Sequence, residues 1–405
     1  MTTTATAPVH PTECPTDQEL LARFGPLFDD IAAGAVQREV QLQLPRAEVQ
    51  RLKAANFGAL RIPQEQGGFG ASLPQLFLLL TRLAAADSNL TQLWRGHFAF
   101  VEGLLLDDGG PRAQRWFPVI VRGAMIGNAS SELTGTSLED ISTTISGDGA
   151  APLLNGTKYY STGSIYADWI AGSALTDGER VSYAVAAAAP GVECRDDWDG
   201  FGQKLTGSGT TVFADVPVDR ADIRPFVRHQ PSHVHAFFQL VLVASLAGIA
   251  RAATDDVVGF VAPRTRTYIN ATSPVPAGDP QVQQVIGEVS SLAFSAAASV
   301  DAAARALGVS LGVLTTEGLG TGVQRDAVAE AEIAVYQAQV SVIPQVLTIT
   351  SRLFEVGGAS AVSIARGLDR HWRNARTIAS HNPAIYKARA IGEWELTGEL
   401  DRLRT

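Results

Sequence analysis

Residues 155–163 read Asn-Gly-Thr-Lys-Tyr-Tyr-Ser-Thr-Gly and lie near the middle of a chain of 405 residues. Asn155-Gly156 is a favoured pair for a two-residue hairpin turn, because both positions tolerate positive φ. Other short β-type runs separated by turn signals extend from Gly123 to Arg224, and they include Trp169–Ala171, Val181–Ala187 and Thr211–Phe213. We therefore predict a β domain of about 100 residues in the centre of the chain.

Helical patterns flank this region on both sides. From Asp17, apolar residues recur every three or four positions and share one face, and further helices are expected over 45–56, 73–86 and 90–106. After the β region, helices are expected over 237–261, 280–307, 322–356 and 360–378, apolar on more than one side as in a bundle or an oligomer interface. We predict an α+β fold with a disordered tail (1–15), an N-terminal α-helical domain (16–120), a β-barrel or sandwich domain (121–226) and a C-terminal four-helix bundle (227–405).

The net charge, the cysteine count and the apolar runs of the chain argue against several classes of binding partner and site. The 32 basic and 41 acidic residues give a net charge of −9, which argues against nucleic acid and anionic membrane. Cys14 and Cys194 are too few for a disulfide framework or a cysteine zinc site, so a reducing cytoplasm is expected. The apolar run 237–250 is shorter than the ~20 residues that span a bilayer, and no signal-peptide pattern opens the chain.

Three motifs resemble those of the acyl-CoA dehydrogenases. Residues 56–68 look like the "G-x-x-x-x-P-E-E-Y-G-G" signature, 155–163 look like the flavin-contacting "N-G-x-K-x-W-I-T" strand, and 198–218 resemble "G-x-R-x-S-x-T-x-x-x-x-F-x-x-V-x-V-P". Together with the order of helices, strands and helices, they identify the sequence as a member of the acyl-CoA dehydrogenase superfamily. The resemblance implies an acyl-CoA dehydrogenase-like fold.

The C-terminal region points to one branch of that superfamily. Many dehydrogenases place a catalytic Glu in a "Y-E-G-T" motif, but here His381 and Asn382 stand at those positions, and an amide cannot accept a proton from carbon. Residues 370–383 instead resemble the flavin-dependent monooxygenases, which include dibenzothiophene and sulfur-acquisition monooxygenases. Ile378 and Asn382 depart from the usual "R-T-H-T-L-H-D-P" of that branch. An FAD-dependent acyl-CoA dehydrogenase or oxidase with its Glu elsewhere stays open as the alternative.

This resemblance implies a two-component enzyme. A separate NAD(P)H:flavin reductase supplies FMNH2, or FADH2, which reacts with O2 to a C4a-hydroperoxyflavin that oxygenates a small organic substrate at S, N or aromatic C. The protein supplies a dry pocket and hydrogen-bond donors. The small-residue faces Ala296–Ala298 and Ala302–Ala304 permit close helix approach and predict a homotetramer.

The same resemblance suggests catalytic residues. His381 is expected to donate to the flavin peroxide or relay its proton, since imidazole has a pKa near 6.5; the alternative is a cation at a helix C-terminus. His97 is the second candidate, and its alternative is a hydrogen-bonded core histidine. Asn382 and Ser161 complete the expected catalytic set.

The expected cofactor residues are small polar groups, an indole and an arginine. Asn128, Ser130 and Ser131 correspond to the turn at the flavin pyrimidine, Thr162 to the group that reaches N5, and Trp198 to the wall of the ring. Ser208 is also expected to bind the cofactor. Either Arg264 or Arg266 is expected to reach the cofactor phosphate across a subunit boundary. Ordinary turn chemistry is the alternative for each small residue. His229, His233 and His235 lack interleaved carboxylates or thiols, so no metal site is predicted.

Overall fold

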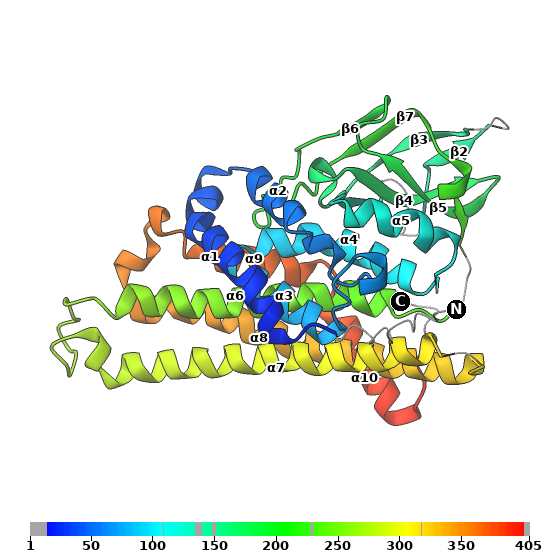
Figure 1. Cartoon of the computed structure of the whole chain (residues 1–405). Coiled ribbons are helices and arrows are strands. Elements are labelled where there is room, and N and C mark those ends of the chain that lie inside the picture. The colour runs from blue at the N-terminus through cyan, green and yellow to red at the C-terminus, as the bar shows by residue number, and fades with distance from the viewer. Residues whose placement is uncertain are drawn as a thin grey trace, which may run out of the picture.

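The computed structural model describes residues 14–107, 109–133, 140–147, 151–226, 230–316 and 318–400. Figure 1 shows a group of helices from the first part of the chain, a sheet beside them, and a set of long helices below both. The tail expected over 1–15 lies outside the described residues except for Cys14 and Pro15. Fold class and element order thus agree with the α+β prediction.

The N-terminal helices begin where side chains can cap them. Helix α1 starts after Thr16, whose hydroxyl accepts from the Glu19 N–H while the Glu19 carboxylate accepts from the Thr16 N–H. Ser72 and Gln75 form the same capping box at α3. Such caps satisfy the free N–H groups of a first helical turn. The helices are α1 (Asp17–Gln41), α2 (Arg46–Ala54), α3 (Leu73–Ala86), α4 (Ser88–Leu105) and α5 (Pro111–Val121).

The β region forms one mixed sheet of eight described strands. Their order is β6-β7-β3-β2-β4-β5-β8, with β1 pairing with β4. The pairs β1–β4 and β2–β4 are parallel and the others are antiparallel. The strands are β1 (Ile126–Ala129), β2 (Thr144–Ser146), β3 (Leu153–Lys158), β4 (Trp169–Thr176), β5 (Glu179–Ala186), β6 (Val192–Cys194), β7 (Thr211–Pro217) and β8 (Arg224–Pro225).

The hairpin turn expected at Asn155-Gly156 is wrong. Strand β3 runs through both residues, and its register with β7 shifts there at a bulge. A Cβ on Gly156 would lie 2.4 Å from the Thr143 hydroxyl oxygen, so glycine is required by close packing and not by a turn. The chain turns only after Lys158, where Tyr160 adopts a left-handed φ of 60°. Residues 159–162 therefore lie in the turn that follows β3 and not in the strand.

The C-terminal part consists of α6 (Val234–Val261), α7 (Pro280–Leu314), α8 (Thr321–Gly357), α9 (Asp369–Ser380) and α10 (Ala384–Thr397). The three long helices lie side by side in Figure 1, and α9 packs against α6 and α8. The helix expected over 360–378 begins later than predicted. Two 3-10 turns occupy 359–366, and Gly367, with a φ of 58°, precedes α9.

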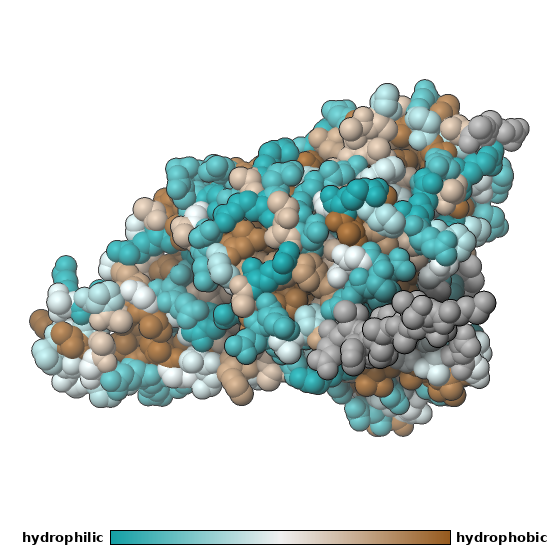
Figure 2. Space-filling model, in the orientation of Figure 1, coloured by the Kyte–Doolittle hydropathy of each residue, from teal (hydrophilic) through white to brown (hydrophobic). Residues whose placement is uncertain are grey.

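Helices α6, α7 and α8 are long and apolar enough to cross a membrane by length and composition. The longest unbroken apolar run in the sequence, 237–250, is too short to predict such a helix. The mean hydropathy of a longer window stays high even when single polar residues interrupt it. The apolar window of α6 is 83% buried inside the protein, whereas that of α7 is only 28% buried. Phe294 and Val309 on α7 are 77% and 66% exposed, and Figure 2 shows hydrophobic surface along this helix. One chain therefore leaves apolar surface on α7 uncovered.

A buried ion cluster joins the N-terminal helices to the long helices. Glu102 on α4 is fully buried and accepts from Arg61 Nε at 2.7 Å, and it lies 2.8 Å from His233 Nε2 just before α6. Burial raises the pKa of the Glu102 carboxyl, but the Arg61 charge and the His233 hydrogen bond outweigh it and lower this pKa to about 2. The carboxylate is therefore charged and fully partnered.

Replacing this carboxylate should destabilise the fold in a pH-dependent way. Because the folded pKa of Glu102 is depressed from 4.5 to about 2, its contribution is present above pH 4.5 and is lost as pH falls toward 2. We expect Glu102→Gln to lower the free energy of unfolding at pH 7 by about 3–5 kcal/mol, since Arg61 loses its buried partner. Urea unfolding between pH 7 and 2.5 measures both effects.

The control is Glu193→Gln, which removes an exposed carboxylate paired with Arg195. It should change stability little, because solvent screens such pairs. Equal pH dependence of unfolding in the wild type and in Glu102→Gln would contradict the assignment.

Candidate active site

The candidate site lies where α4, the first turns of α6 and the joint between α9 and α10 meet. Helix α9 ends at Ser380, His381 follows as its C-cap, and α10 begins at Ala384 after Pro383. The break expected before Pro383 is confirmed. A Cβ on Gly96 of α4 would lie 2.7 Å from the Asn128 Cβ, so this part of α4 also touches the end of β1. Three segments distant in sequence thus converge here.

Arg95 on α4 and His381 form the central contact. Arg95 Nη1 lies 3.1 Å from His381 Nε2, and Arg95 Nε donates to the Phe238 carbonyl oxygen at 2.9 Å. The guanidinium carbon is 4.8 Å from the centroid of the Phe238 ring. A guanidinium can only donate, so His381 Nε2 must accept. His381 therefore carries its proton on Nδ1 and is neutral.

The electrostatics of this pair differ from the expectation of an imidazole pKa near 6.5. Burial within the protein and the Arg95 charge lower the pKa of His381 to about 3. Burial lowers the pKa of Arg95 to about 10, so the guanidinium stays charged at pH 7. With Nε2 accepting from Arg95, His381 can donate a hydrogen bond from Nδ1.

The His381 side chain is exposed to solvent. Sequence reasoning missed Arg95 as a site residue. The available signal was a single cation in the first turns of an otherwise apolar helical run.

His97 has a different environment. Its side chain is fully buried, Nδ1 accepts from the Ile126 N–H at 3.1 Å, and Nε2 lies 2.9 Å from the Gly58 carbonyl oxygen. Burial lowers the pKa of His97 to about 4. Both ring nitrogens are thus used to join α4 to β1 and to the turn containing Gly58. This arrangement favours the hydrogen-bonded core histidine over a catalytic role for His97.

Asn382 holds the joint between α9 and α10. Its Nδ2 donates to Gln239 Oε1 of α6 at 2.7 Å, and its carbonyl oxygen accepts from Gln339 Nε2 of α8 at 3.2 Å. These bonds fix the position of the neighbouring His381 against the long helices. The contacts make Asn382 a positioning residue.

A chain of hydroxyl groups lines the turn after β3. Thr162 Oγ1 lies 2.8 Å from Ser208 Oγ, which lies 2.7 Å from Thr206 Oγ1, and Thr206 donates to the Gln203 carbonyl oxygen. The neighbouring Ser161 hydroxyl is buried and has no hydrogen-bond partner among the described residues. A buried hydroxyl without a partner is uncommon and suits a place where a bound group supplies one.

A buried ion pair holds the turn after β1 in place. Lys158 Nζ and the Glu132 carboxylate are 2.7 Å apart, and both side chains are buried. Lys158 also donates to the Ser130 carbonyl oxygen, and Ser130 Oγ donates to Asn128 Oδ1 at 3.2 Å. The Ser131 carbonyl oxygen accepts from Tyr159 N–H at 2.9 Å. The predicted residues of this turn are therefore held together with the turn after β3.

Trp198 lies against that second turn. Its ring centroid is 6.0 Å from that of Tyr160 at an interplanar angle of 62°, and its Nε1 donates to the Gly202 carbonyl oxygen at 3.2 Å. An aromatic wall thus stands beside the hydroxyl groups. The structure brings Asn128, Ser130, Ser131, Ser161, Thr162, Trp198 and Ser208 into one region of the sheet.

The two arginines expected at the phosphate lie elsewhere in the same chain. The loop after α6 is at the far end of the long helices from the sheet, as Figure 1 shows, and Phe238 and Val261 are about 35 Å apart along the helix axis. Arg264 Nη1 donates to the Gly357 carbonyl oxygen at 2.7 Å. Arg266 is exposed and has no hydrogen bond or ion pair to any described residue. Neither arginine reaches the other site residues within one chain.

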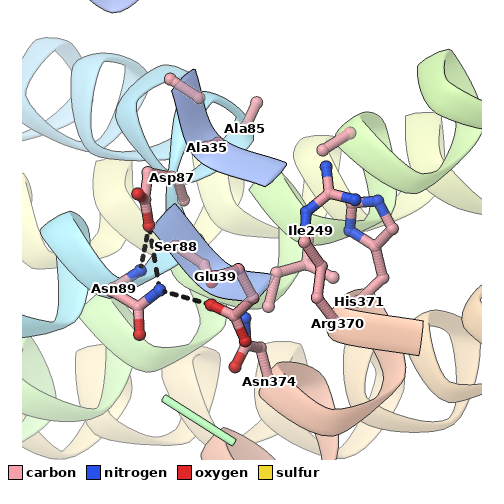
Figure 3. A pocket seen from close by; sticks show the side chains of 13 residues that line it. Ala35, Glu39, Ala85, Asp87, Ser88, Asn89, Ile249, Arg370, His371 and Asn374 are labelled. Carbon is pink, nitrogen blue, oxygen red and sulfur yellow. Dashed lines mark hydrogen bonds between the residues drawn. The ribbon is translucent and has the colours of Figure 1, made fainter. Parts of the chain in front are cut away.

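A separate cavity lies between α1, α4, α6 and α9. It has a volume of about 20 Å³, room for roughly one water. Figure 3 shows polar side chains around it, where Asn89 Nδ2 donates to the carboxylates of Glu39 and Asp87 at 3.2 and 3.0 Å. The cavity is too small for an organic substrate and contains none of the predicted site residues.

The histidines near α6 bind different carboxylates. His233 contacts Glu102, and His235 Nδ1 lies 2.7 Å from Glu332 Oε1. His229 lies outside the described residues. Within the described ranges, no group of three or more His, Cys, Asp or Glu side chains has the arrangement of a metal site.

Comparison with known proteins agrees with this geometry. Residues 240–384 match the model of the acyl-CoA dehydrogenase C-terminal domain family. The chain is 28% identical to the probable FMNH2-dependent monooxygenase SfnC of Pseudomonas putida, over 91% of this chain and 93% of the relative. The chain belongs to the acyl-CoA dehydrogenase superfamily. Within it, the chain lies in the FMNH2-dependent monooxygenase branch.

Solved structures of the branch superpose closely. Methanesulfinate monooxygenase MsuC of Pseudomonas fluorescens is 26% identical with a TM-score of 0.84, covering 94% of this chain and 97% of that chain. TdsC of a Paenibacillus species, in complex with FMN and indole, is 28% identical with a TM-score of 0.84, covering 94% of this chain and 98% of that chain. These likenesses extend over both the sheet and the long helices.

Proposed function

We propose that this enzyme is an FMNH2-dependent monooxygenase acting on a small sulfur-containing or aromatic substrate. One atom of O2 enters the substrate, the other leaves as water, and reduced FMN supplies the two electrons. The observation that carries the proposal is the α9–α10 joint, where a neutral imidazole faces the Arg95 guanidinium and the Asn382 amide donates to Gln239. An amide cannot accept a proton from carbon, so Asn382 cannot act as the base that many acyl-CoA dehydrogenases carry at this position.

The residues present fit a flavin. The unpartnered Ser161 hydroxyl, the Thr162–Ser208 pair and the amide of Asn128 offer donors and acceptors suited to a heteroaromatic ring, and Trp198 offers an aromatic wall. When bound, FMN would supply the activation of oxygen. The chain's own residues would orient the ring and exclude water, and His381 Nδ1–H would donate a hydrogen bond at the reacting centre.

We further propose a cytoplasmic homotetramer supplied with FMNH2 by a separate reductase. The sequence contains no nicotinamide-binding fingerprint, which favours an external source of reduced flavin. The apolar α7 surface favours association, since it is largely uncovered in one chain. We infer that Arg266, which is exposed and remote from the site of its own chain, serves the phosphate of a flavin bound to another copy.

Removing one hydroxyl should weaken flavin binding. Thr162→Val deletes the group that pairs with Ser208, and we expect its Kd for FMNH2 to rise roughly 5–10-fold, the cost of one lost hydrogen bond. Anaerobic titration followed by protein fluorescence measures this value. Thr144→Val, on an exposed position of β2, is the matched control and should bind as the wild type does. Retention of tightly bound FAD with acyl-CoA turnover would overturn the proposed function.

The phosphate arginine can be identified by comparing FMN with riboflavin, which lacks the phosphate. Arg266→Gln should raise the Kd for FMN and leave that for riboflavin unchanged. Arg264→Gln should affect both alike, because Arg264 is already bound to Gly357 and Phe260 of its own chain. Light scattering on each variant reports whether the tetramer persists. An unchanged FMN affinity in Arg266→Gln would remove this residue from the phosphate site.

A further inference from the structure

The chain of hydroxyl groups beside the turn after β3 has a defined direction. The Gln203 carbonyl oxygen can only accept, so the Thr206 hydroxyl, 2.8 Å away, gives it its single proton. Thr206 Oγ1 then offers only lone pairs to Ser208, whose hydroxyl must donate across the 2.7 Å contact. Because the proton of Ser208 is used there, Thr162 must donate to Ser208 across 2.8 Å. Every hydroxyl proton of the chain therefore points toward Gln203.

The proton of Thr162 is thus committed to Ser208. The Tyr160 carbonyl oxygen is a second acceptor, but it lies 3.5 Å from Thr162 Oγ1. Hydrogen bonds from hydroxyl groups to oxygen usually span about 2.5–3.0 Å. Turning the proton to Tyr160 would also leave the oxygens of Thr162 and Ser208 in contact with no proton between them. The Thr162 side chain is partly exposed, and its oxygen can offer a bound group only lone pairs.

The Gln203 carbonyl that sets this direction is held by two helices. Gln203 has a left-handed φ of 53°, a conformation that a residue with a Cβ keeps only where its surroundings enforce it. Its N–H donates to Asn374 Oδ1 of α9 at 2.6 Å, and its Nε2 donates to Ser88 Oγ of α4 at 2.9 Å. Both partners are buried. The carbonyl is therefore fixed, and the hydroxyl chain cannot reverse while Thr206 is present.

A fixed acceptor distinguishes the two redox states of a flavin. Thr162 is the residue expected to reach N5 of the ring. In the oxidised ring N5 carries a lone pair and no hydrogen, whereas in the reduced ring it carries an N–H group. A hydroxyl that offers only lone pairs attracts the second and repels the first. The neighbouring Ser161 hydroxyl has no partner among the described residues and can turn its proton either way, so it favours neither state.

We propose that Gln203 and Thr206 are positioning residues that make Thr162 an acceptor, so that the site selects the reduced flavin over the oxidised one. This inference rests on the proposed monooxygenase function and adds the specificity of its flavin site. The preference comes from an unfavourable contact with the wrong form as well as from a hydrogen bond to the right one. Such a site favours entry of FMNH2 and release of FMN.

The test removes the link between Gln203 and Ser208. Thr206→Val deletes one hydroxyl and keeps the shape of the side chain, so Ser208 can donate to Thr162 and Thr162 can donate to the ring. We expect the ratio of the Kd for FMN to the Kd for FMNH2 to fall roughly 5–10-fold, chiefly because oxidised FMN gains one hydrogen bond. Fluorescence titration of the full chain, anaerobic for FMNH2, measures both constants. Damage to the fold would instead weaken both forms.

Two further variants serve as controls. Thr206→Ser retains the hydroxyl and should keep the ratio of the wild type. Thr350→Val removes another buried hydroxyl that donates to a backbone carbonyl, that of Val346 on α8, and should also leave the ratio unchanged.

The outcomes separate this inference from the proposed function. A wild type that binds FMN as tightly as FMNH2, an unchanged ratio in Thr206→Val, or equal weakening of both forms would overturn the role of the hydroxyl chain and leave the monooxygenase function standing. A wild type that binds neither form would overturn both.

Discussion

Several polar side chains of α4 lie in apolar surroundings and bind partners outside the helix, because an unpaired buried polar group costs more than most packing contacts return. Asn89 accepts from the loop before β7, His97 from the start of β1, Arg95 donates to α6, and Glu102 binds the residue that precedes α6. These partners belong to different layers. One helix thereby holds the sheet and the long helices in a fixed relation, and the candidate site lies where they meet.

This constraint also explains the protonation state of the site. Arg95 donates to the Phe238 carbonyl oxygen and to the His381 ring, and the second contact excludes a proton from Nε2. Asn382, bound to α6 and α8, keeps His381 in reach. The site thus combines one fixed positive charge with a neutral donor. That combination suits chemistry carried by a bound flavin and offers nothing to an enzyme that must remove a proton from carbon.

Sequence patterns predicted the element types well wherever periodicity was long. The helices that begin at Asp17, Leu73 and Pro280 follow from their apolar spacing, although the last extends to Leu314, beyond its predicted end at Leu307. Short-range signals failed where tertiary packing overrides them: Asn155-Gly156 is a turn pair by propensity, yet Thr143 packs against Gly156 inside a strand. The residues that the motif resemblance assigns to the flavin lie in one region of the structure, and their role stays a prediction. The motifs do not show that both ring nitrogens of His97 are hydrogen-bonded to backbone groups. They also do not show that Arg95 contacts His381, which lies 286 positions later in the chain.

The most direct test of the account is the reaction of the reduced FMN–protein complex with O2 in the absence of any substrate. Stopped-flow mixing of the anaerobic complex with oxygenated buffer, followed by flavin absorbance, makes this measurement without knowledge of the natural substrate. We predict that oxidised-flavin absorbance returns only after a delay, because a water-excluding pocket keeps activated oxygen at the flavin until a substrate arrives. Immediate single-phase return at the rate of free FMNH2 would contradict assignment as a monooxygenase.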